Sequence, residues 1–413
     1  MVQPLSEDEI RRRIDAVNAH PTIRAAAHSL RMKASTLGHF LETMRSTGRL
    51  DDHELSPAPE VIREPTRVET RDADFWRKKH VEAQKELAEA EHLLAQFAGM
   101  SVPLIIPDWI VQASVGRGKS VIGCLLSDVH MGEVVSADEL NGLNAFNPDI
   151  CRTRLRRYFS AACTIGARWA SDTDCEGVLL TLGGDLLSGD IHEELRISNA
   201  ITSQEQCVAV AEEIVAGINH LLEAYGRVHV VSVPGNHGRP TPKPTAKLYA
   251  RLSYDTLAAS MVAAQFKDNP RVTFQSTGAK DQVTPIFGRS VFQTHGDNIG
   301  TRGGMGFAGP ILPIVRGTKK VEAQQASVGR RPDLILHGHY HTTANPGSVL
   351  SNGSVVGYSE YGSDIRAAVE PPMQWLYLLH SKWFLRERMP VQLEDPSIPE
   401  KPRVTVPAGW ART

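Results

Sequence analysis

The sequence has few cysteines and no apolar run long enough to cross a membrane. Its five cysteines are scattered, and no two of them form a CxxC pair, which argues against a cysteine zinc site or a disulfide framework. No run of about 18 apolar residues occurs, and the N-terminus MVQPLSEDEI has no apolar signal core. We therefore expect a reduced, cytoplasmic protein that does not contact a membrane.

The chain also lacks a strong charge of either sign. Lys and Arg number 45 against 47 for Asp and Glu, which gives a net charge of −2. No field of the whole protein attracts nucleic acid, so any such contact needs a local basic patch. Hydrophobic residues make up 41% of the 413 residues, which is ordinary for a globular chain of two or three domains.

Changes in composition and hydrophobic pattern divide the sequence into four parts. Residues 1–55 are expected to form a small all-α domain. Residues 56–118 combine a proline-containing linker with one long amphipathic helix over 71–98. That helix is either a spacer or a coiled-coil segment that joins two copies of the chain into a homo-oligomer. Residues 119–390 form the main domain, and residues 391–413 form a tail.

In the main domain, short apolar runs alternate with helical stretches, which predicts an α/β core. Buried strands are expected at 121–127, 178–182, 228–233, 290–294 and 334–336. Helices are expected at about 149–170, 199–225 and 243–266. The later segments 342–361 and 374–386 are typical of strands with little helix between them.

Five polar motifs lie at or just beyond the ends of these strands. They are Asp128-Val129-His130, Gly184-Asp185, Gly235-Asn236-His237, His295-Gly296 and Gly338-His339-Tyr340-His341. Ligands of open α/β sheets bind at the carboxyl ends of the strands, so these side chains are expected at one rim. Carboxylate, imidazole and amide oxygen suit Mn, Fe or Zn. A single motif of this kind is usually a turn or a core histidine, but the ordered set predicts a metal site.

The ordered set resembles the calcineurin-like metallophosphoesterase family, whose signature is D-x-H, G-D-x-x-D, G-N-H-D/E, H and G-H-x-H. The resemblance covers about residues 119–385 and implies a two-sheet β-sandwich flanked by helices. It also implies two divalent metal ions, with Mn ahead of Fe or Zn. The implied ligands are Asp128, His130 and His341 for the first ion, Asp185 as the bridge, and Asn236, His295 and His339 for the second. His237 would be the catalytic residue that faces the scissile phosphate.

The sequence departs from the family signature at two places. Leu186, Leu187 and Ser188 follow Asp185, where the family often has a second aspartate. Gly238 follows His237, where the family usually has an acidic residue that orients the histidine. Another acceptor is then needed for His237, either Asp190 or a backbone carbonyl.

Several further residues are candidates for lesser roles. His192 and Arg239 are candidate substrate contacts, although each also fits an ordinary exposed loop. Asp297 could orient His295. Residues 300–320, which contain six glycines, are expected to form an irregular loop or a flap over the site.

Residues 22–44 have the pattern of a helix-turn-helix. Ile23, Ala26, Ala27 and Leu30 would pack the first helix, and Leu37, Phe40 and Leu41 the second, with Ser35 as its N-cap. Residues 1–50 hold eight basic and five acidic residues, an excess of three. DNA contacts are expected from Lys33, Ser35, Thr36 and His39. The alternative is a helical hairpin that serves packing or oligomerisation.

The sequence as a whole predicts a metal-dependent phosphoesterase that attacks with a metal-activated hydroxide. The segments GGDLLSG and PGNH are similar to those of DNA-repair exonucleases and of the archaeal polymerase proofreading subunit. This similarity and the N-terminal helices favour a phosphodiesterase, that is, a nuclease acting on DNA. The alternatives are a phosphatase of phosphoproteins or small molecules, and a DNA-binding protein without catalysis.

Overall fold

The computed structural model describes most of the chain as two compact units, Met1–Leu87 and Ala88–Thr413. The described residues are 5–20, 22–50, 74–85, 88, 106–111, 117–300 and 309–394. Within these ranges no helix is long and apolar enough to cross a membrane. Each unit is described by itself.

In the first unit, residues 5–20 and 22–50 form three helices around a small apolar core. They are α1 (Glu7–Ala19), α2 (Ile23–Ser29) and α3 (Ala34–Ser46). Ala26 and Ala27 from α2 pack against Leu37, Phe40 and Leu41 from α3, and Ile10 of α1 completes the core. The Thr22 side chain caps α2 by accepting from the amide of Ala25. The helix-turn-helix shape expected for residues 22–44 is therefore present.

Two details of this segment differ from the expectation. Ile23 is 45% exposed and does not belong to the core. Ser35 lies inside α3, whose N-cap is Lys33 without a side-chain cap bond. The tight turn instead bends at Arg31, whose φ of 52° is left-handed. Because this turn already ends at Lys33, α3 begins one residue before the serine.

Residues 74–85 form a helix, which is part of the long helix expected over 71–98. Phe75 and Trp76 are exposed on it. The rest of that helix, apart from residue 88, lies outside the described residues, as do the linker at 56–70 and residues 395–413. Pairing of two copies through this helix stays a prediction.

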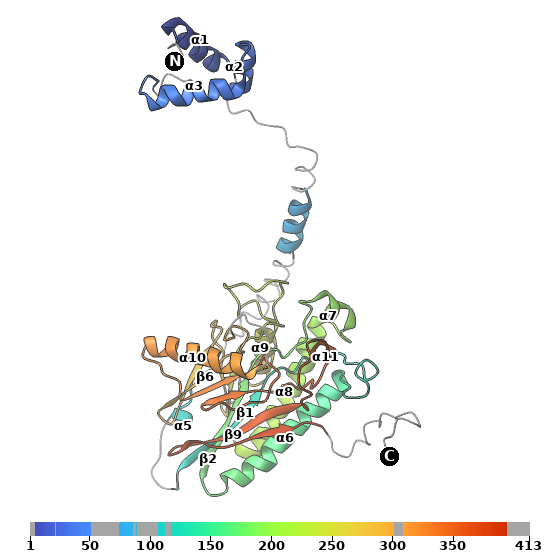
Figure 1. Cartoon of the computed structure of the whole chain (residues 1–413). Coiled ribbons are helices and arrows are strands. Elements are labelled where there is room, and N and C mark those ends of the chain that lie inside the picture. The colour runs from blue at the N-terminus through green and yellow to red at the C-terminus, as the bar shows by residue number, and fades with distance from the viewer. Residues whose placement is uncertain are drawn as a thin grey trace, which may run out of the picture. The chain divides into compact units, whose positions relative to one another are not determined.

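The second unit is built on two mixed β-sheets (Figure 1). The larger sheet has the order β10-β9-β1-β2-β3-β4. β1 to β4 run parallel, and β9 and β10 are antiparallel additions at one edge. The strands are β1 (Lys119–Leu126), β2 (Asp174–Leu182), β3 (Val228–Ser232), β4 (Val272–Gln275), β9 (Met373–His380) and β10 (Phe384–Gln392).

The smaller sheet has the order β5-β6-β7-β8. β5 pairs antiparallel with β6, and β6, β7 and β8 are parallel. Their bounds are β5 (Gln282–Ile286), β6 (Arg289–Gln293), β7 (Leu334–His337) and β8 (Val349–Ser351).

The alternation of side chains along the strands places the core on both faces of the larger sheet. In β1, Val121 and Leu125 pack toward the smaller sheet, where they meet Val291 and Leu336. The other face of β1, which includes Ile122, packs against helices. These helices are α6 (Pro148–Ala170), α8 (Ser203–Tyr225) and α9 (Tyr254–Gln265).

A fourth helix, α10 (Ile311–Ser327), packs through Val321 on Phe292 and Ile335 of the smaller sheet. Figure 1 shows α6 and α10 on opposite sides of the paired sheets. Three short helices complete the described part of this unit: α5 (Asp108–Val111), α7 (Glu193–Ser198) and α11 (Glu360–Asp364). The α/β class expected from the sequence is confirmed.

Some element boundaries expected from the sequence are wrong. The helix expected at 243–266 begins only at Tyr254, and the segment before it contains prolines at 240, 242 and 244, which disfavour a helix that would include them in its interior. Residues 342–361 contain only β8 and the start of α11. Residues 311–320 are helical rather than irregular, and β10 runs to Gln392, into the expected tail.

Candidate metal centre

Five loops carry the candidate ligands, and each loop follows the carboxyl end of a parallel strand. Asp128 and His130 follow β1, Asp185 follows β2, and Asn236 with His237 follows β3. His295 follows β6, and His339 with His341 follows β7. Their donor atoms form three overlapping groups, each within 4.8 Å: Asp128, His130 and His341; His130, Asp185 and His237; and Asp185, His295 and His339.

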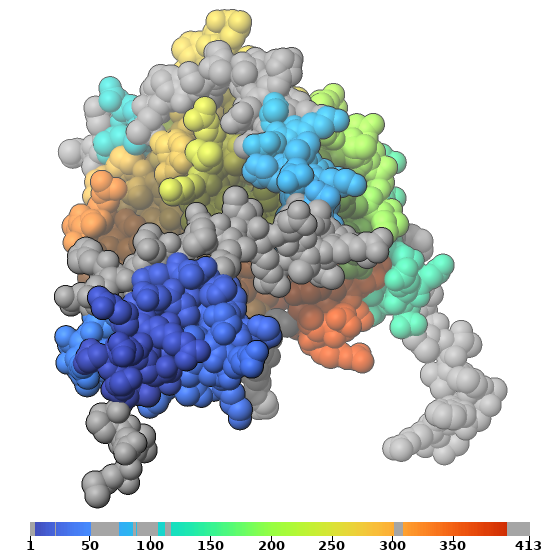
Figure 2. Space-filling model, turned by 90° about the horizontal axis from the view of Figure 1, so that it is seen from above, coloured from blue at the N-terminus to red at the C-terminus, as the bar shows by residue number. Residues whose placement is uncertain are grey.

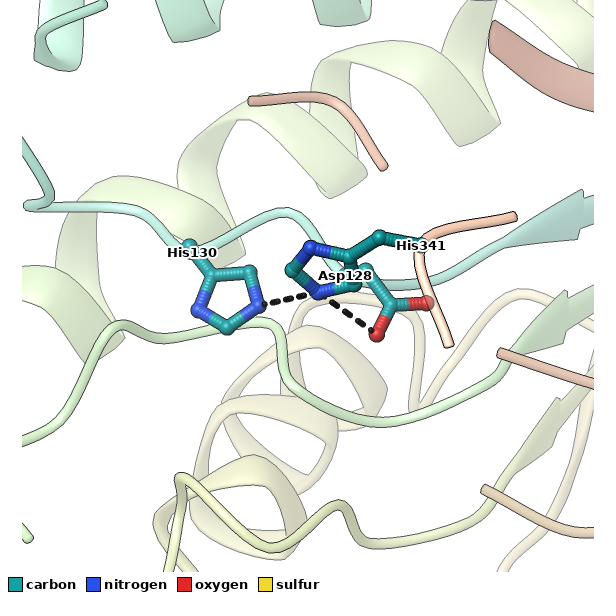
Figure 3. A group of neighbouring side chains, drawn as sticks. All are labelled: Asp128, His130 and His341. Atoms are coloured by element: carbon teal, nitrogen blue, oxygen red, sulfur yellow. Dashed lines mark hydrogen bonds and ion pairs between the residues drawn. The ribbon is translucent and has the colours of Figure 1, made fainter. Parts of the chain in front are cut away.

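The first group joins the loops after β1 and β7 (Figure 3). His130 Nε2 lies 3.1 Å from His341 Nε2. His341 Nε2 also lies 3.4 Å from Asp128 Oδ1. The same Oδ1 accepts a 2.9 Å hydrogen bond from the amide of His339. Two imidazole nitrogens and one carboxylate oxygen therefore point at a common place.

The third group, extended by Asn236, has a donor set that suits a cation. His295 Nδ1 donates to the carbonyl of Gly183 at 2.9 Å, because a carbonyl only accepts. In the neutral ring this leaves Nε2 with a lone pair, and Nε2 faces Asp185 Oδ2 at 3.0 Å and Asn236 Oδ1 at 3.1 Å. Three electron-pair donors then converge, which requires either a proton on Nε2 or a positive ion. The residues present therefore fit a divalent metal.

The middle group connects the other two into one cluster. The rings of His130 and His237 are 4.6 Å apart between centroids. Asp185 belongs to both the middle and the third group. Its Oδ1 accepts from the amide of His237 at 2.7 Å, while its Oδ2 faces His295. Asp185 thus lies at the centre of the cluster, where the sequence resemblance implies a bridging ligand.

Burial and mutual attraction set the charge states in the cluster. Burial raises the pKa of Asp185, but attraction to His295 outweighs it and holds the pKa well below its ordinary value. Burial lowers the pKa of His295, but Asp185 outweighs it and raises that pKa. Burial, with repulsion from His237, holds the pKa of His130 well below its ordinary value. Burial also lowers the pKa of His339 to about 4. Ionised carboxylates and neutral imidazoles are the forms that bind metals, so a bound cation would have to displace the protons that the raised pKa values favour on His295 and His341.

His237 is held by a backbone carbonyl and not by a carboxylate. Its Nδ1 donates to the carbonyl of Ser188 at 2.7 Å, which leaves Nε2 for other contacts. Asp190, the alternative acceptor expected from the sequence, is exposed. Burial lowers the pKa of His237, although Asp185 opposes this effect.

The members of the cluster differ in their exposure to solvent. Asp128, His130, Asp185 and His295 are at most 2% exposed. Asn236, His237, His339 and His341 are half-buried and are its more accessible members.

The side chains of the two candidate substrate contacts, His192 and Arg239, differ in whether they are already engaged in hydrogen bonds. The exposed His192 precedes α7, and its ring centroid is 6.1 Å from that of His237. Figure 2 shows α7 in light green at the surface of the upper face. The guanidinium of Arg239 instead donates to the carbonyls of Asn236, Thr241 and Pro242 at 2.6 to 3.1 Å. It therefore braces its own loop.

Five of the candidate ligands have a left-handed backbone. The φ values lie between 47° and 70° for Asp128, His130, Asp185, His339 and His341. Such a conformation costs an L-residue about 1 kcal/mol or more. The surrounding structure holds these residues in place, as is common at functional sites.

Sequence reasoning missed two acidic residues beside the cluster. Glu133 Oε2 lies 3.6 Å from His130 Nδ1, a buried nitrogen without a hydrogen-bond partner. Burial raises the pKa of Glu133 to about 7. Asp255, in the first turn of α9, accepts from three backbone amides of the site. The sequence offers one signal for Glu133, its position three residues after His130. It offers none for Asp255, which belongs to no motif.

Asp297 does not orient His295, as the sequence had suggested. It accepts from Lys280 at 2.8 Å and from the Tyr249 hydroxyl at 3.2 Å. The Nδ1 of His295 is already bonded to Gly183. Asp297 therefore connects the loops that surround the site without contacting the ligand.

A scan against models of known protein families finds no match to this chain, and a search of curated proteins finds none. The function must therefore be argued from the geometry of the cluster.

Proposed function

We propose that the chain is a phosphoester hydrolase that uses two divalent metal ions, Mn²⁺ first, and that its substrate is DNA. The proposal follows the resemblance to the calcineurin-like metallophosphoesterases, including their two-sheet sandwich. The observation that carries it is the single cluster in which carboxylate, imidazole and amide donors from five strand ends converge. No other group of three or more His, Cys, Asp or Glu side chains in the described ranges has this spacing.

Each residue of the cluster has a separate task in this proposal. Asp128, His130 and His341 would hold one ion, and Asn236, His295 and His339 the other, with Asp185 shared. When bound, two divalent cations supply Lewis-acid stabilisation of the phosphate oxygens and an acidified water as nucleophile. His237 is fixed at Nδ1 by Ser188, so Nε2 is the atom that would exchange a proton with the leaving oxygen, and it would donate one only from the protonated ring.

The support for DNA comes from the first unit. α2 and α3 form a helix-turn-helix, and Lys33, Ser35, Thr36 and His39 are all exposed at its turn and on α3. Residues 1–50 are basic although the whole chain is slightly acidic. Phosphate contacts from such a module would raise the local concentration of DNA at the hydrolase.

The test is to incubate the full chain with Mn²⁺ and four substrates. These are labelled single-stranded DNA, labelled double-stranded DNA, bis-p-nitrophenyl phosphate and p-nitrophenyl phosphate. We expect cleavage of DNA and of the diester, and a loss of about 10³-fold or more in Asp128→Ala. The control Asp138→Ala removes an exposed carboxylate outside the cluster and should retain activity.

Two results would contradict the proposal in different ways. Turnover of the monoester alone would replace the DNA substrate with a phosphatase function. Bound Mn²⁺ without turnover of any substrate would reject the hydrolase and leave a metal-containing DNA-binding protein.

A further inference from the structure

The carboxylate of Asp255 receives three backbone amides from two loops of the metal centre. Its Oδ2 accepts from Gly235 at 2.7 Å and from Asp185 at 3.1 Å. Its Oδ1 accepts from Leu186 at 2.9 Å. Asp255 is 0% exposed, so no solvent competes for these bonds. One buried side chain therefore joins the loop after β2 to the loop after β3.

These contacts fix residues that carry candidate ligands. The amide of Asp185 belongs to the central carboxylate of the cluster, and Gly235 directly precedes Asn236. A hydrogen bond to a charged group is stronger than one between neutral groups. The three bonds thus hold the Asp185 and Asn236 loops at a set separation. His295 Nε2 lies 3.0 Å from Asp185 Oδ2 and 3.1 Å from Asn236 Oδ1.

Because Gly238 has no side chain, it leaves room for the carboxylate of Asp255. A Cβ at position 238 would lie 2.7 Å from Ser253 Oγ and 2.9 Å from Asp255 Oδ2, both too close for an ordinary contact. The carbonyl of Gly238 accepts from the amide of Tyr254 at 2.7 Å. The start of α9 is therefore packed directly onto the loop that contains His237.

We propose that Asp255 is a positioning residue that sets the separation of Asp185 and Asn236, and with it the affinity of the centre for a divalent cation. The inference rests on the proposed metal site. Supporting groups behind metal ligands commonly change affinity by 10–100-fold when they are removed.

The test measures Mn²⁺ binding to the EDTA-stripped full chain by isothermal titration calorimetry. Asp255→Asn replaces one oxygen with an NH₂ group, which cannot accept from an amide. We expect Mn²⁺ to bind it about 10–100-fold more weakly. Gly238→Ala keeps Asp255 but displaces its carboxylate, and should weaken Mn²⁺ binding by a smaller factor.

The matched control is Glu213→Gln, because Glu213 is also a buried carboxylate. It accepts from Arg156 Nε at 3.0 Å and Nη2 at 2.7 Å, and lies on α8 away from the cluster. This variant should lose stability, measured as the thermal unfolding temperature, and keep its Mn²⁺ affinity within about twofold.

Distinct results separate the possible failures. If Asp255→Asn loses stability as Glu213→Gln does but binds Mn²⁺ within twofold of the unchanged chain, Asp255 has only a structural role and the inference is wrong. If Asp255→Asn does not fold, unchanged Mn²⁺ affinity in Gly238→Ala overturns it instead. If the unchanged chain binds no Mn²⁺, the proposed metal site itself fails.

Discussion

At the scale of single residues, the hydrogen bond from His237 to Ser188 decides which nitrogen can reach a substrate. A carbonyl at 2.7 Å from Nδ1 keeps the proton on that nitrogen. Nε2 is then the nitrogen left for a substrate, and the exposed ring of His192 lies 6.1 Å from the His237 ring between centroids. This arrangement suits proton transfer at Nε2.

Replacing His237 tests whether it acts in catalysis or in metal binding. We expect His237→Ala to lower diester turnover by about 10²–10⁴-fold and to leave Mn²⁺ affinity within about threefold. Turnover of bis-p-nitrophenyl phosphate and calorimetric titration with Mn²⁺ measure the two quantities on the same preparation.

His220→Ala is the control, because His220 is a half-exposed histidine on α8. A ring nitrogen of His237 also lies within 4.8 Å of donor atoms of His130 and Asp185. A loss of Mn²⁺ affinity as large as that of Asp185→Asn would therefore make His237 a ligand and refute the catalytic role.

The convergence of the candidate ligands could be predicted from sequence because each follows a strand, and the strand ends of a parallel sheet meet at one edge. The role of Asp255 could not be predicted. Its partners are backbone amides of two loops that are distant in sequence, and they come close only when α9 packs onto these loops. The support of His237 by Ser188 was predictable only as one of two alternatives. Nothing in the local sequence of His295 distinguishes Gly183 from Asp297 as its partner.

At the scale of elements, the strands that bear the ligands match their expected positions within a few residues. β4 and β5 were missed, because β4 has four residues and β5 alternates polar and apolar residues around Pro285. α10 was missed because Pro313 and Gly317 weaken its local helical pattern. Close packing explains Gly317, since a Cβ there would lie 2.0 Å from the carbonyl oxygen of Ile299.

The buried His229 on β3 makes the stability of the sheet depend on pH. Burial lowers its pKa from 6.5 to about 4, and its ring contacts only the neutral Thr273 and Gln275 at hydrogen-bond distance. Between pH 6.5 and 4 the unfolded chain binds a proton that the folded chain does not. The free energy of unfolding therefore falls as the pH falls through this window, by about 3 kcal/mol for this group.

Urea unfolding at pH 7.5, 6, 5 and 4, followed by circular dichroism, measures this effect. Other groups also titrate in this range, so the difference between the unchanged chain and His229→Gln isolates the contribution of His229. We expect His229→Gln to lose less stability on acidification than the unchanged chain, while the control His220→Gln behaves as the unchanged chain does. Equal pH dependence in all three proteins would contradict the prediction.

At the scale of the whole molecule, the two units have separate apolar cores. The three-helix core contains Leu37 and Phe40, and it shares no residue with the cores on either side of the sheets. All candidate metal ligands belong to the second unit. A cation should therefore stabilise one unit and leave the other unchanged.

Differential scanning calorimetry of the full chain tests this division. Mn²⁺ at about 100 times its dissociation constant adds about 2.7 kcal/mol to the unit that binds it, which raises its unfolding temperature by roughly 5 °C. The three-helix transition should not move. Leu37→Ala identifies that transition, since the cavity lowers its stability by about 2–5 kcal/mol. A shift of both transitions by Mn²⁺ would refute the separation.

The distance along the chain between the ligands also constrains how the protein is made. His130 and His341 lie 211 residues apart in sequence, yet their Nε2 atoms are 3.1 Å apart. β1 pairs with β9, which begins at Met373. During translation, β1 to β3 leave the ribosome long before His339 and His341 are synthesised. Capture of a cation by the full donor set would therefore be a late event in biosynthesis, because a chain stalled before residue 341 lacks part of the donor set.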